Sequence, residues 1–596
     1  MSIRTRRSGR FSIVLLLVSV VFFGAGVSAR GAAAGAPPEM LAHLTNPGEG
    51  WTAFQPASDT RMVFVSSSQG EDSNDGLSPG RPLKTIAKGL ARLRNDHSDW
   101  LLLKRGDVWR GSIGMITANR LKNGRSPEQP TLIASYGAAG ARPLLKLGDA
   151  GNGLRVAVNR PAKARNMAVV GIHFYDEKGD PGSEEFVEDR EKDGAGIAWA
   201  APGENLLIED CRFRYVSGGA VVGRSPWKGT PDDELRNVKV RRCVATHAWS
   251  TSGHCQGFFF SKVKGLVLEE NVLDHNGYSI ETGDLPTWFN HNVYITTDCD
   301  DVVARGNIVA RGSTTGIYCR TNGVLEGNLC LDNTPSLNLG RIRKARPGGV
   351  TGRVTGNVVI DAAPRTNEKR TIRGNGIEVG NVNTEGVVVE NNILIGASES
   401  PGALSIGPAG VGVHNAVFRH NTVYNWSRAF SVIGVHSRQL QKLQISGNRF
   451  EHNLIQNPGR EQMGLIRVRD MAEPRGVAFG RNLYWSGAER AEWFLVGAGD
   501  RRTVGVDFEE WSQRARDTAS RVERVRFADP ARTAATYHAT LGGQATRQAF
   551  LAEAARQSKF NWRPQYTAAA VIEYIREGFR PLRDVQGAGA VEPSAP

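Results

Sequence analysis

The chain contains a repeat of fixed length, and this repeat constrains the fold more than any other feature of the sequence. Val-Ala-Arg-Gly-Asn-Ile at 303–308 returns as Leu-Glu-Gly-Asn-Leu at 325–329, which places Asn307 and Asn328 21 residues apart. Both segments read as short β-strands beside a turn. A fixed period of this length predicts a solenoid, in which each repeat forms one coil and buries its apolar face against its neighbours.

Other strands carry a residue equivalent to these asparagines. Aligned on this turn position, nine segments place asparagine or cysteine in one column: Cys211, Cys243, Asn271, Asn307, Asn328, Asn357, Asn392, Asn421 and Asn448. Stacked amides can hydrogen-bond along such a column, and a small cysteine can replace asparagine where the turn is buried. The column therefore predicts one continuous stack of coils.

A second set of strands predicts the face of the stack on which a site would lie. Its members alternate apolar and polar residues, as a strand with one buried face does. Ile317 and Cys319 are expected to point inward and Tyr318 outward. Coils stack about 4.8 Å apart, so the outward residues form a ladder on a parallel sheet. The register predicts this outward row as Phe259, Tyr294, Tyr318, Asn338, Glu378 and Ser405.

Steps longer than 21 residues mark loops inserted between coils. Insertions at 245–256, 277–291 and 358–375 all precede the outward row, and insertions at 224–234 and 340–348 follow it. Loops at one edge of a rigid stack commonly carry function. We therefore expect the outward row to lie in a groove walled by loops.

The N-terminal segment predicts export. Residues 1–29 combine a basic start, an apolar stretch and a Val-Ser-Ala cleavage site, which is the pattern of a signal peptide. A membrane anchor is the alternative, but the apolar stretch is short, so we expect no stable membrane span after cleavage. Residues 30–60 read as a small-residue linker.

The charge of the chain bears on its partner. The formal net charge of +14 falls to +10 once the four arginines of 1–29 are removed. An exported basic protein favours an acidic polysaccharide or a cell surface as partner and not nucleic acid, although a generally basic proteome would also explain the charge. The oligomeric state is not encoded in any motif, and we expect a monomer.

The cysteines predict packing residues. None has the Cys-x-x-Cys spacing of a zinc site. Export permits disulfides, but several cysteines fall where the repeat needs a small buried residue, so we expect free thiols in the core and no metal site. All six lie within the coils: Cys211, Cys243, Cys255, Cys299, Cys319 and Cys330.

The start of the stack resembles a known family. Residues 62–104 predict a strand, a turn rich in Asp, Asn, Ser and Gly, a helix and a second strand. This order, with the phrases at 125–137 and 587–593, resembles the secreted right-handed parallel β-helix proteins of the pectin-lyase-like superfamily. The resemblance implies an all-β, right-handed parallel β-helix with an N-terminal cap over 61–484. Residues 485–596 contain helical patterns and are expected to cap the C-terminal end.

The groove collects the residue types that β-elimination of a uronic acid requires. A cation neutralises the uronate carboxylate, a base removes the acidified proton, and an acid assists the leaving oxygen. We predict His291 or Tyr294 as base or acid and Arg320 as the carboxylate partner, with His254 as a further catalytic candidate. Each has a structural alternative, because turn histidines are often only hydrogen-bonded and neighbouring tyrosines can simply pack.

Aromatic and charged residues around these four form the predicted substrate-binding set. Aromatic faces contact sugar rings, and Arg or Lys binds carboxylates. The run that begins at Arg341 also has the composition of an ordinary solvated basic loop. The set comprises Phe259, Tyr318, Asn338, Arg341, Lys344, Lys369 and Glu378.

Acidic residues leave two further hypotheses open. The aspartates within 298–301 could form the carboxylate pair of a glycosidase, but an Asp-rich turn is favoured because the surrounding phrase differs from that of β-helix polygalacturonases. Calcium remains an open cofactor, with Glu378, Glu281 and Asp284 as candidate ligands, although no ligand spacing supports it. The acidic turn around Asp72 misses the EF-hand pattern and reads as structural.

The predicted function is an exported carbohydrate-active enzyme that acts on an acidic polysaccharide, with a β-eliminating lyase as the leading hypothesis. The resemblance supports this class, since related β-helix folds host lyases, epimerases and hydrolases. A glycoside hydrolase or uronate epimerase in the same groove is one alternative. A non-catalytic polysaccharide-binding surface protein is the other, and fold alone cannot choose among them.

Overall fold

The computed structural model describes residues 37–582, apart from gaps at 49, 226–232, 342–345, 363, 367–370, 373, 397–401, 408–409, 433–443, 460–463, 469–475 and 498–502. The predicted signal peptide at 1–29 and the C-terminal phrase at 587–593 lie outside the described residues. Among the helices that are described, none has the length and apolar character needed to cross a membrane.

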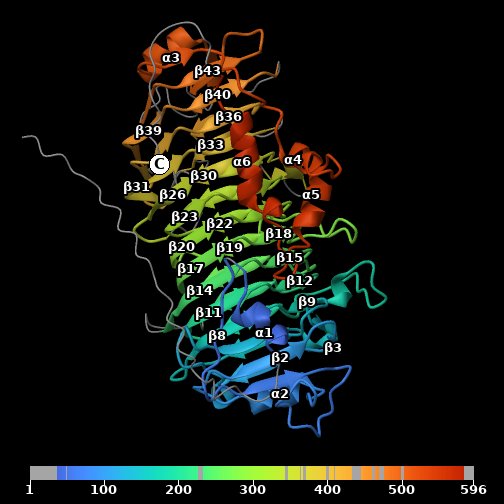
Figure 1. Cartoon of the computed structure of the whole chain (residues 1–596). Helices are drawn as coiled ribbons and strands as arrows, with labels where there is room; N and C mark the ends of the chain where they lie inside the picture. The colour runs from blue at the N-terminus through green and yellow to red at the C-terminus, as the bar shows by residue number, and fades with distance from the viewer. Residues whose placement is uncertain are drawn as a thin grey trace, which may run out of the picture.

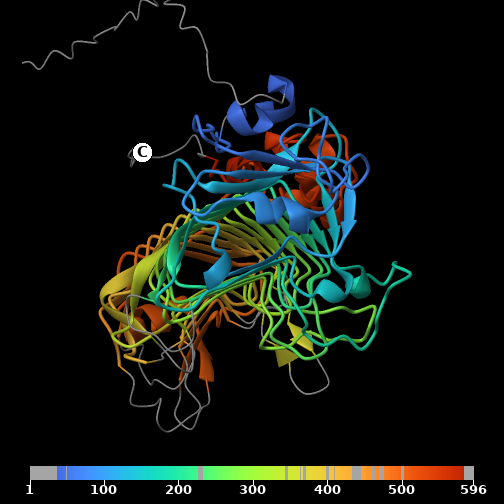
Figure 2. The ribbon, with the colours of Figure 1, turned by 90° about the horizontal axis from the view of Figure 1, so that it is seen from below.

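The chain winds into a right-handed parallel β-helix, as the repeat and the resemblance predict (Figure 1). Each full coil contributes one strand to each of three sheets. Among the described residues, sheet A has 16 strands and begins at β1 (Met62–Val65). Sheets B and C have 14 described strands each and begin at β3 (Val108–Arg110) and β4 (Gly114–Thr117). Seen from below, the coils lie over one another along the stack (Figure 2).

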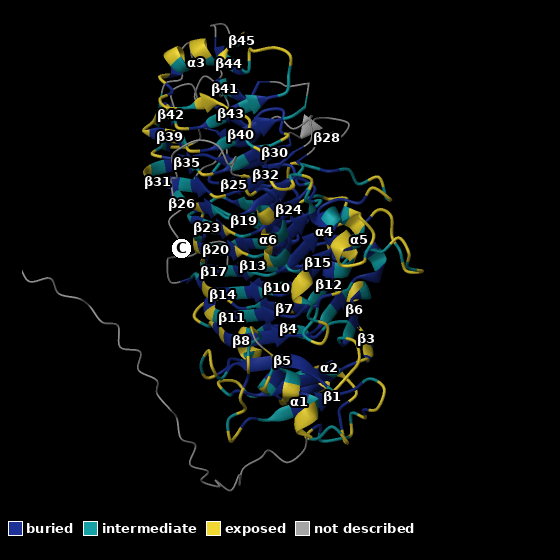
Figure 3. Cartoon of the chain, turned by 45° about the horizontal axis from the view of Figure 1, so that its top comes forward, coloured by how far each residue is buried: buried dark blue, intermediate teal, exposed yellow. Residues whose placement is uncertain are grey.

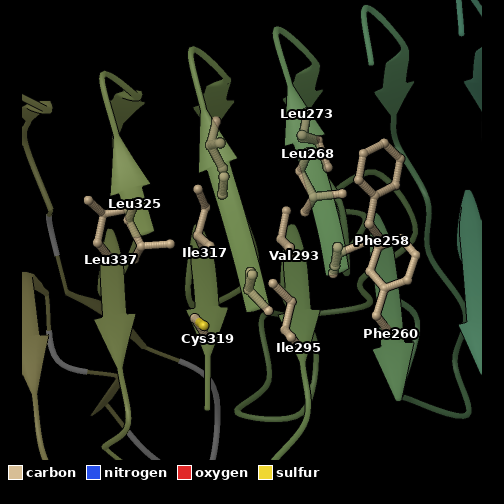
Figure 4. Packing of buried hydrophobic residues seen from close by; sticks show 14 of the residues in the cluster. Phe258, Phe260, Leu268, Leu273, Val293, Ile295, Ile317, Cys319, Leu325 and Leu337 are labelled. Carbon is tan, nitrogen blue, oxygen red and sulfur yellow. The ribbon is translucent and has the colours of Figure 1, made fainter. Parts of the chain in front are cut away.

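The coil at the centre of the repeat shows how the sequence produces this geometry. β20 (Asp300–Arg305) lies in sheet A, β21 (Ile308–Ala310) in sheet B and β22 (Ile317–Cys319) in sheet C. The first and last residues of β22 are fully buried, whereas Tyr318 between them is partly exposed, as the alternation predicts. Figure 4 shows the inward residues of this strand beside Val293 of the preceding coil.

An asparagine ladder joins the coils at the turn between sheets A and B. The side-chain amide of Asn307 donates to Asn328 Oδ1 at 2.9 Å, and the backbone N–H of Asn307 donates to the same oxygen at 3.1 Å. The same amide-to-amide hydrogen bond recurs on successive coils from Asn271 to Asn482. Cysteine occupies the ladder position on the coil before Asn271, and Cys243 there donates its backbone N–H to Asn271. The ladder therefore satisfies polar groups that the stack hides from water.

One member of the predicted column is wrong. Asn421 donates to Asn453, and Asn453 donates to Asn482, so Asn448 is not part of this ladder. Asn448 begins β39 (Asn448–Glu451) in sheet A, which pairs with the strand that precedes Asn421. Apolar side chains of these two strands set the register, and this register brings Asn453 to the turn.

Replacing Asn328 by alanine is expected to lower the thermal unfolding midpoint. Asn328 donates to Asn357 and accepts from Asn307, so its loss leaves buried groups unpaired, each at a cost of about 1–3 kcal/mol. Thermal unfolding of N328A beside N119A, in which an exposed asparagine is replaced, measures the difference. Equal midpoints in the two variants would contradict a stabilising role for the ladder.

The six cysteines are buried and free, as predicted. Cys211 and Cys243 occupy ladder positions, and Cys319 points into the core (Figure 4). Burial raises the pKa of the Cys255 and Cys319 thiols to about 12, so both stay protonated at neutral pH. A protonated buried thiol behaves as a small apolar side chain, so these cysteines serve packing.

The N-terminal end of the stack is covered as the sequence predicts, with one addition. α2 (Ile86–Arg92) follows the acidic turn, and β2 (Trp100–Lys104) follows α2. Asp72 in this turn accepts backbone N–H groups, including that of Thr85, and is therefore structural. The segment predicted as a linker contains α1 (Pro38–Thr45), whose leucines pack on the outer face of sheet A.

The C-terminal segment does more than the predicted capping. α3 (Phe508–Ala515) closes the end of the stack with a buried tryptophan. α4 (Ala534–Thr540), α5 (Arg547–Ala554) and α6 (Ala568–Gly578) instead lie along the outer face of sheet B (Figure 1). Sheet B strands such as β24 (Leu329–Leu331) are apolar at every position and buried throughout, so this sheet needs cover on both faces (Figure 3).

The same segment reaches back to the N-terminal cap. The guanidinium of Arg242 lies 4.4 Å from the Trp51 ring and 4.3 Å from the Trp562 ring. Nearby, Lys559 and Glu209 form a buried ion pair with an N–O distance of 3.0 Å. Cation–π contacts and a buried ion pair thus join parts of the chain that are far apart in sequence.

Candidate active site

The outward row lies on sheet C in the predicted order. Its register places each residue beside the next: Phe259, Tyr294, Tyr318, Asn338, Glu378 and Ser405. They belong to β16 (Phe258–Ser261), β19 (Val293–Ile295), β22, β25 (Leu337–Leu339), β30 (Asn375–Val379) and β33 (Gly402–Ile406). We call these six residues the sheet C row. Its three aromatic members are partly exposed, whereas its three polar members are buried.

The aromatic members form a continuous platform. The ring centroids of Phe259 and Tyr294 are 5.4 Å apart in an edge-to-face arrangement, and those of Tyr294 and Tyr318 are 5.5 Å apart and nearly parallel. Such pairs stabilise a sheet by about 0.5–1.5 kcal/mol beyond burial, so the rings do pack on one another. Their partial exposure leaves apolar surface for contact with a sugar ring.

His291 lies against the two tyrosines of this platform in one defined tautomer. Its ring centroid is 5.1 Å from that of Tyr294 and 4.8 Å from that of Tyr318. The Thr314 hydroxyl lies 2.6 Å from both the Asn290 carbonyl oxygen and His291 Nδ1. A carbonyl can only accept, so the hydroxyl donates to Asn290 and accepts the Nδ1 proton of His291. Nε2 is then the unprotonated nitrogen, as a general base requires.

The surroundings keep His291 neutral. Burial is the main cause that lowers its pKa to about 3, and the positive charge of Arg320 and the nearby His254 contribute to the same shift. Only 4% of the residue is exposed. The imidazole is therefore uncharged at neutral pH, and its basicity depends on which charges lie beside it.

Arg320 distinguishes the two tyrosines. Its guanidinium donates to the Tyr294 hydroxyl oxygen and lies 5.4 Å and 5.9 Å from the rings of Tyr294 and Tyr318. The Tyr318 hydroxyl instead donates to the Arg341 carbonyl oxygen at 3.3 Å, and burial raises the pKa of Tyr318 well above its usual value. Tyr318 therefore stays protonated, and Tyr294 is the tyrosine whose oxygen faces a cation.

Glu378 and Arg341 form an ion pair at the far end of the row. Arg341 Nη1 and the Asn375 amide donate to Glu378 Oε1, and the Asn338 amide donates to Oε2 at 3.1 Å. Arg341 was predicted to bind a substrate carboxylate, but its charge is directed at Glu378. This pairing offsets the cost of burying the Glu378 carboxylate, which is 5% exposed.

The remaining predicted residues lie at the rim or beyond the described parts of the chain. His254 is exposed in the loop before β16, with its ring 5.2 Å from that of Phe289 in the next loop. Lys344 and Lys369 lie outside the described residues. The catalytic candidates that the structure brings together are therefore His291, Tyr294 and Arg320, with His254 nearby.

The aspartates within 298–301 are turn residues, as favoured. Asp298 accepts the backbone N–H of Lys262 at 3.2 Å. Asp300 accepts from Asn322 at 3.0 Å and from Arg346 at 3.1 Å. Carboxylates held in this way stabilise the turn that leads into β20.

The residues present do not fit a calcium ion at the row. Calcium takes six to eight oxygen ligands, whereas both oxygens of Glu378 already accept hydrogen bonds from amide or guanidinium groups. Burial raises the pKa of Asp284 to about 7, which weakens it as an anionic ligand. Within the described ranges, no three Asp, Glu, His or Cys side chains are placed to hold a metal ion together.

Two residues that build the site were not predicted. Thr314 sets the tautomer of His291, and Asn375 holds Glu378. Thr314 belongs to the polar run at 313–315 just before β22, which the repeat alignment treated only as turn. The signal that could have found Thr314 is this polar run itself. It lies one coil after His291, directly before the next sheet C strand.

Fold and site together define the chain as a right-handed parallel β-helix protein with an aromatic and charged row on one sheet. No protein-family model matches the chain, and no curated protein matches it.

Several solved structures match this chain with low TM-scores and low sequence identity. The lacto-N-biosidase of family GH136 from Eubacterium ramulus has 14% identity, covers 78% of this chain and 68% of its own, and has a TM-score of 0.35. Pectate lyase Pel9A has 14% identity, coverage of 66% and 82%, and a TM-score of 0.32. A mannuronic acid specific polysaccharide family 6 lyase from human gut microbiota has 13% identity, coverage of 78% and 91%, and a TM-score of 0.42. Likeness at this level does not assign an activity to this chain.

Proposed function

We propose that this protein is an exported carbohydrate-active enzyme that cleaves an acidic polysaccharide by β-elimination at the sheet C row. The observation that carries the proposal is the neutral His291, which lies against two tyrosines and within the field of Arg320, with its Nδ1 proton held by Thr314. The positive charge of the chain and the partly exposed aromatic platform support an anionic sugar polymer as the substrate.

In the proposed reaction, a uronate residue lies on the aromatic platform with its carboxylate at Arg320. The guanidinium stabilises negative charge on the carboxylate, which acidifies the adjacent C5 proton. His291 Nε2 or the Tyr294 oxygen removes this proton, the electron pair forms the C4–C5 double bond, and the C4–O bond to the neighbouring sugar breaks. The departing oxygen takes a proton from a tyrosine hydroxyl or from water.

Substrate binding would strengthen His291 as a base. In the free protein, burial and the charge of Arg320 oppose protonation of the ring. A uronate carboxylate placed at Arg320 offsets that positive charge and stabilises the imidazolium that forms when the proton is taken. The base is thus weak without substrate and stronger with it, which supports proton transfer only in the complex.

The direct test incubates the purified protein with polymers of galacturonate, mannuronate, guluronate and glucuronate. Ultraviolet absorbance reports unsaturated ends, and a reducing-sugar assay reports all new ends. We expect both signals to rise together on at least one polymer. Reducing ends without absorbance would indicate a hydrolase, and binding without either signal would indicate an adhesion protein.

The pH dependence of the reaction tests the role of His291. The folded pKa of about 3 lies below the usual value, so the ring stays unprotonated in the free protein as pH falls through the range in which ordinary histidines gain a proton. Because kcat/KM reports groups of the free enzyme, its acid limb is expected well below pH 6. An acid limb near pH 6.5 would instead point to a base other than His291.

A further inference from the structure

The corner that follows sheet B carries aromatic rings where the backbone favours other residues. Tyr215, His247 and His275 have φ angles of +57°, +58° and +57° on three successive coils. In this left-handed region glycine, asparagine and aspartate are the least strained choices. The next coil has Arg311 at the same corner, and later coils have Asp332, Asp361 and Asn425. Three ring-bearing residues in this region on successive coils therefore bring aromatic and imidazole groups to one corner.

The three rings form a stack that one loop tyrosine extends. Ring centroids are 5.1 Å apart for Tyr215 and His247, 4.8 Å for His247 and His275, and 4.5 Å for His275 and Tyr278. The strands that carry the corner, β12 (Arg212–Arg214), β15 (Val244–Thr246) and β18 (Val272–Asp274), follow one another along one side of the stack in Figure 1.

A cavity of about 140 Å³ opens against these rings. One water needs roughly 10–15 Å³ of such space, so the cavity holds a small organic group and not merely a bridging water. Segments that follow the sheet B strands of four successive coils enclose it, and it shares no residue with the sheet C row. Besides the four rings, its lining includes Asp180, Trp249, Ser279 and Glu281.

Polar atoms of the ring stack lack partners. His275 Nε2 and His247 Nδ1 are both buried, and neither has a hydrogen-bond partner among the described residues. His275 is only 8% exposed. Burial lowers the pKa of His275 to about 4 and also lowers that of His247, so both rings are neutral. An unpartnered buried nitrogen is costly unless a ligand completes it.

The charges around the cavity select against an anion. Asp180 and Glu281 place carboxylates in its lining. Two nearby arginines are engaged by carboxylates: Arg214 lies 3.5 Å from Asp180, and Arg311 makes two bonds of 2.8 Å and 2.6 Å to Asp274. A uronate would meet carboxylates here, whereas uncharged hydroxyl groups can donate to them.

We propose that this corner cavity binds one neutral sugar residue, at a site separate from the sheet C row. Sugar hydroxyls both donate and accept, so they can bond to the carboxylates of Asp180 and Glu281 and to the unpartnered nitrogens of His247 and His275. The tyrosine rings supply apolar surface for the C–H face of the sugar. The proposal does not depend on β-elimination at the row, because it concerns only neutral sugars.

The test titrates the purified protein with methyl glycosides of glucose, galactose, mannose and rhamnose and with the sodium salts of galacturonate and glucuronate, followed by calorimetry. At least one neutral glycoside is expected to bind below about 100 mM, and each uronate about tenfold or more weakly than it. The variant H275N removes the ring and places asparagine in a left-handed position that suits it, so it should keep its thermal midpoint and lose binding about tenfold or more.

Two further variants make the result decisive. E281Q keeps the shape of the side chain and should weaken binding of the neutral glycoside, whereas Y318A on the sheet C row should leave that binding unchanged. The proposal is overturned if no neutral glycoside binds, if a uronate binds more tightly than every neutral glycoside, or if H275N binds as the unsubstituted protein does. A fall in the midpoint of H275N with unchanged binding would show that the ring stack is only structural.

Discussion

In H291Q, the rate of formation of unsaturated ends is expected to fall by about 10²–10⁴-fold, the usual contribution of a general base. Glutamine is close to histidine in size and can still donate to Thr314, so the neighbouring tyrosines should remain in place. KM should change little, because only 4% of His291 is exposed, so the substitution removes a proton acceptor and little binding surface. Steady-state absorbance kinetics on the cleaved polymer measures both quantities.

H452Q is the matched control for this substitution. His452 is exposed at the turn after β39, away from sheet C, and its replacement should leave the rate unchanged. Thermal midpoints of the two variants show whether either has lost its fold. A folded H291Q with full activity would remove His291 from the reaction and leave Tyr294 as the base.

In R320M, kcat/KM for an anionic polymer is expected to fall by about 10²–10³-fold. The substitution removes the charge that would neutralise the uronate carboxylate, and one such electrostatic contact contributes a factor of this size. R320K should recover part of the loss, since lysine restores the charge but not the planar fork of the guanidinium. The recovery separates a charge effect from a loss of packing against Tyr294.

R305M is the corresponding control. Arg305 is half-exposed on the outer side of sheet A, where it pairs with Glu269, and its loss should not affect activity. In R320M the acid limb of the remaining activity should also move to higher pH, because the charge of Arg320 helps to lower the pKa of His291. If both the acid limb of the pH profile and kcat/KM are unchanged in R320M, Arg320 only supports the tyrosines.

The row was predictable from the sequence because it follows from one period. Strand alternation decides which residues face outward, and the repeat decides which coil lies beside which, so Tyr294, Tyr318 and Asn338 fall in order. The prediction failed at Asn448, where a turn-like phrase lies at the bend between two sheet A strands, β38 (Ile445–Ser446) and β39. A local motif could not show this, because the register there depends on apolar residues in the preceding coil.

The chemical state of the site was not predictable in the same way. The neutral tautomer of His291 depends on Thr314, whose importance lies in its distance from two other groups. The pairing of Arg341 with Glu378 likewise turned a predicted substrate contact into an internal one. Hydrogen-bond partners across neighbouring coils are set by side-chain rotamers, and a repeat alignment contains no information about these.

The sequence by itself determined the architecture: parallel coils, the asparagine ladder with its cysteine start, and the sheet C row. These features depend on a period and on the alternation of buried and exposed residues, and both are properties of a linear chain. Only the tertiary structure decided where α4 to α6 lie, because an outward apolar face on sheet B can be covered by any apolar helix face of suitable length. It also decided which polar groups meet at His291 and at the corner of His275, because burial and charge act through distances that sequence spacing does not contain.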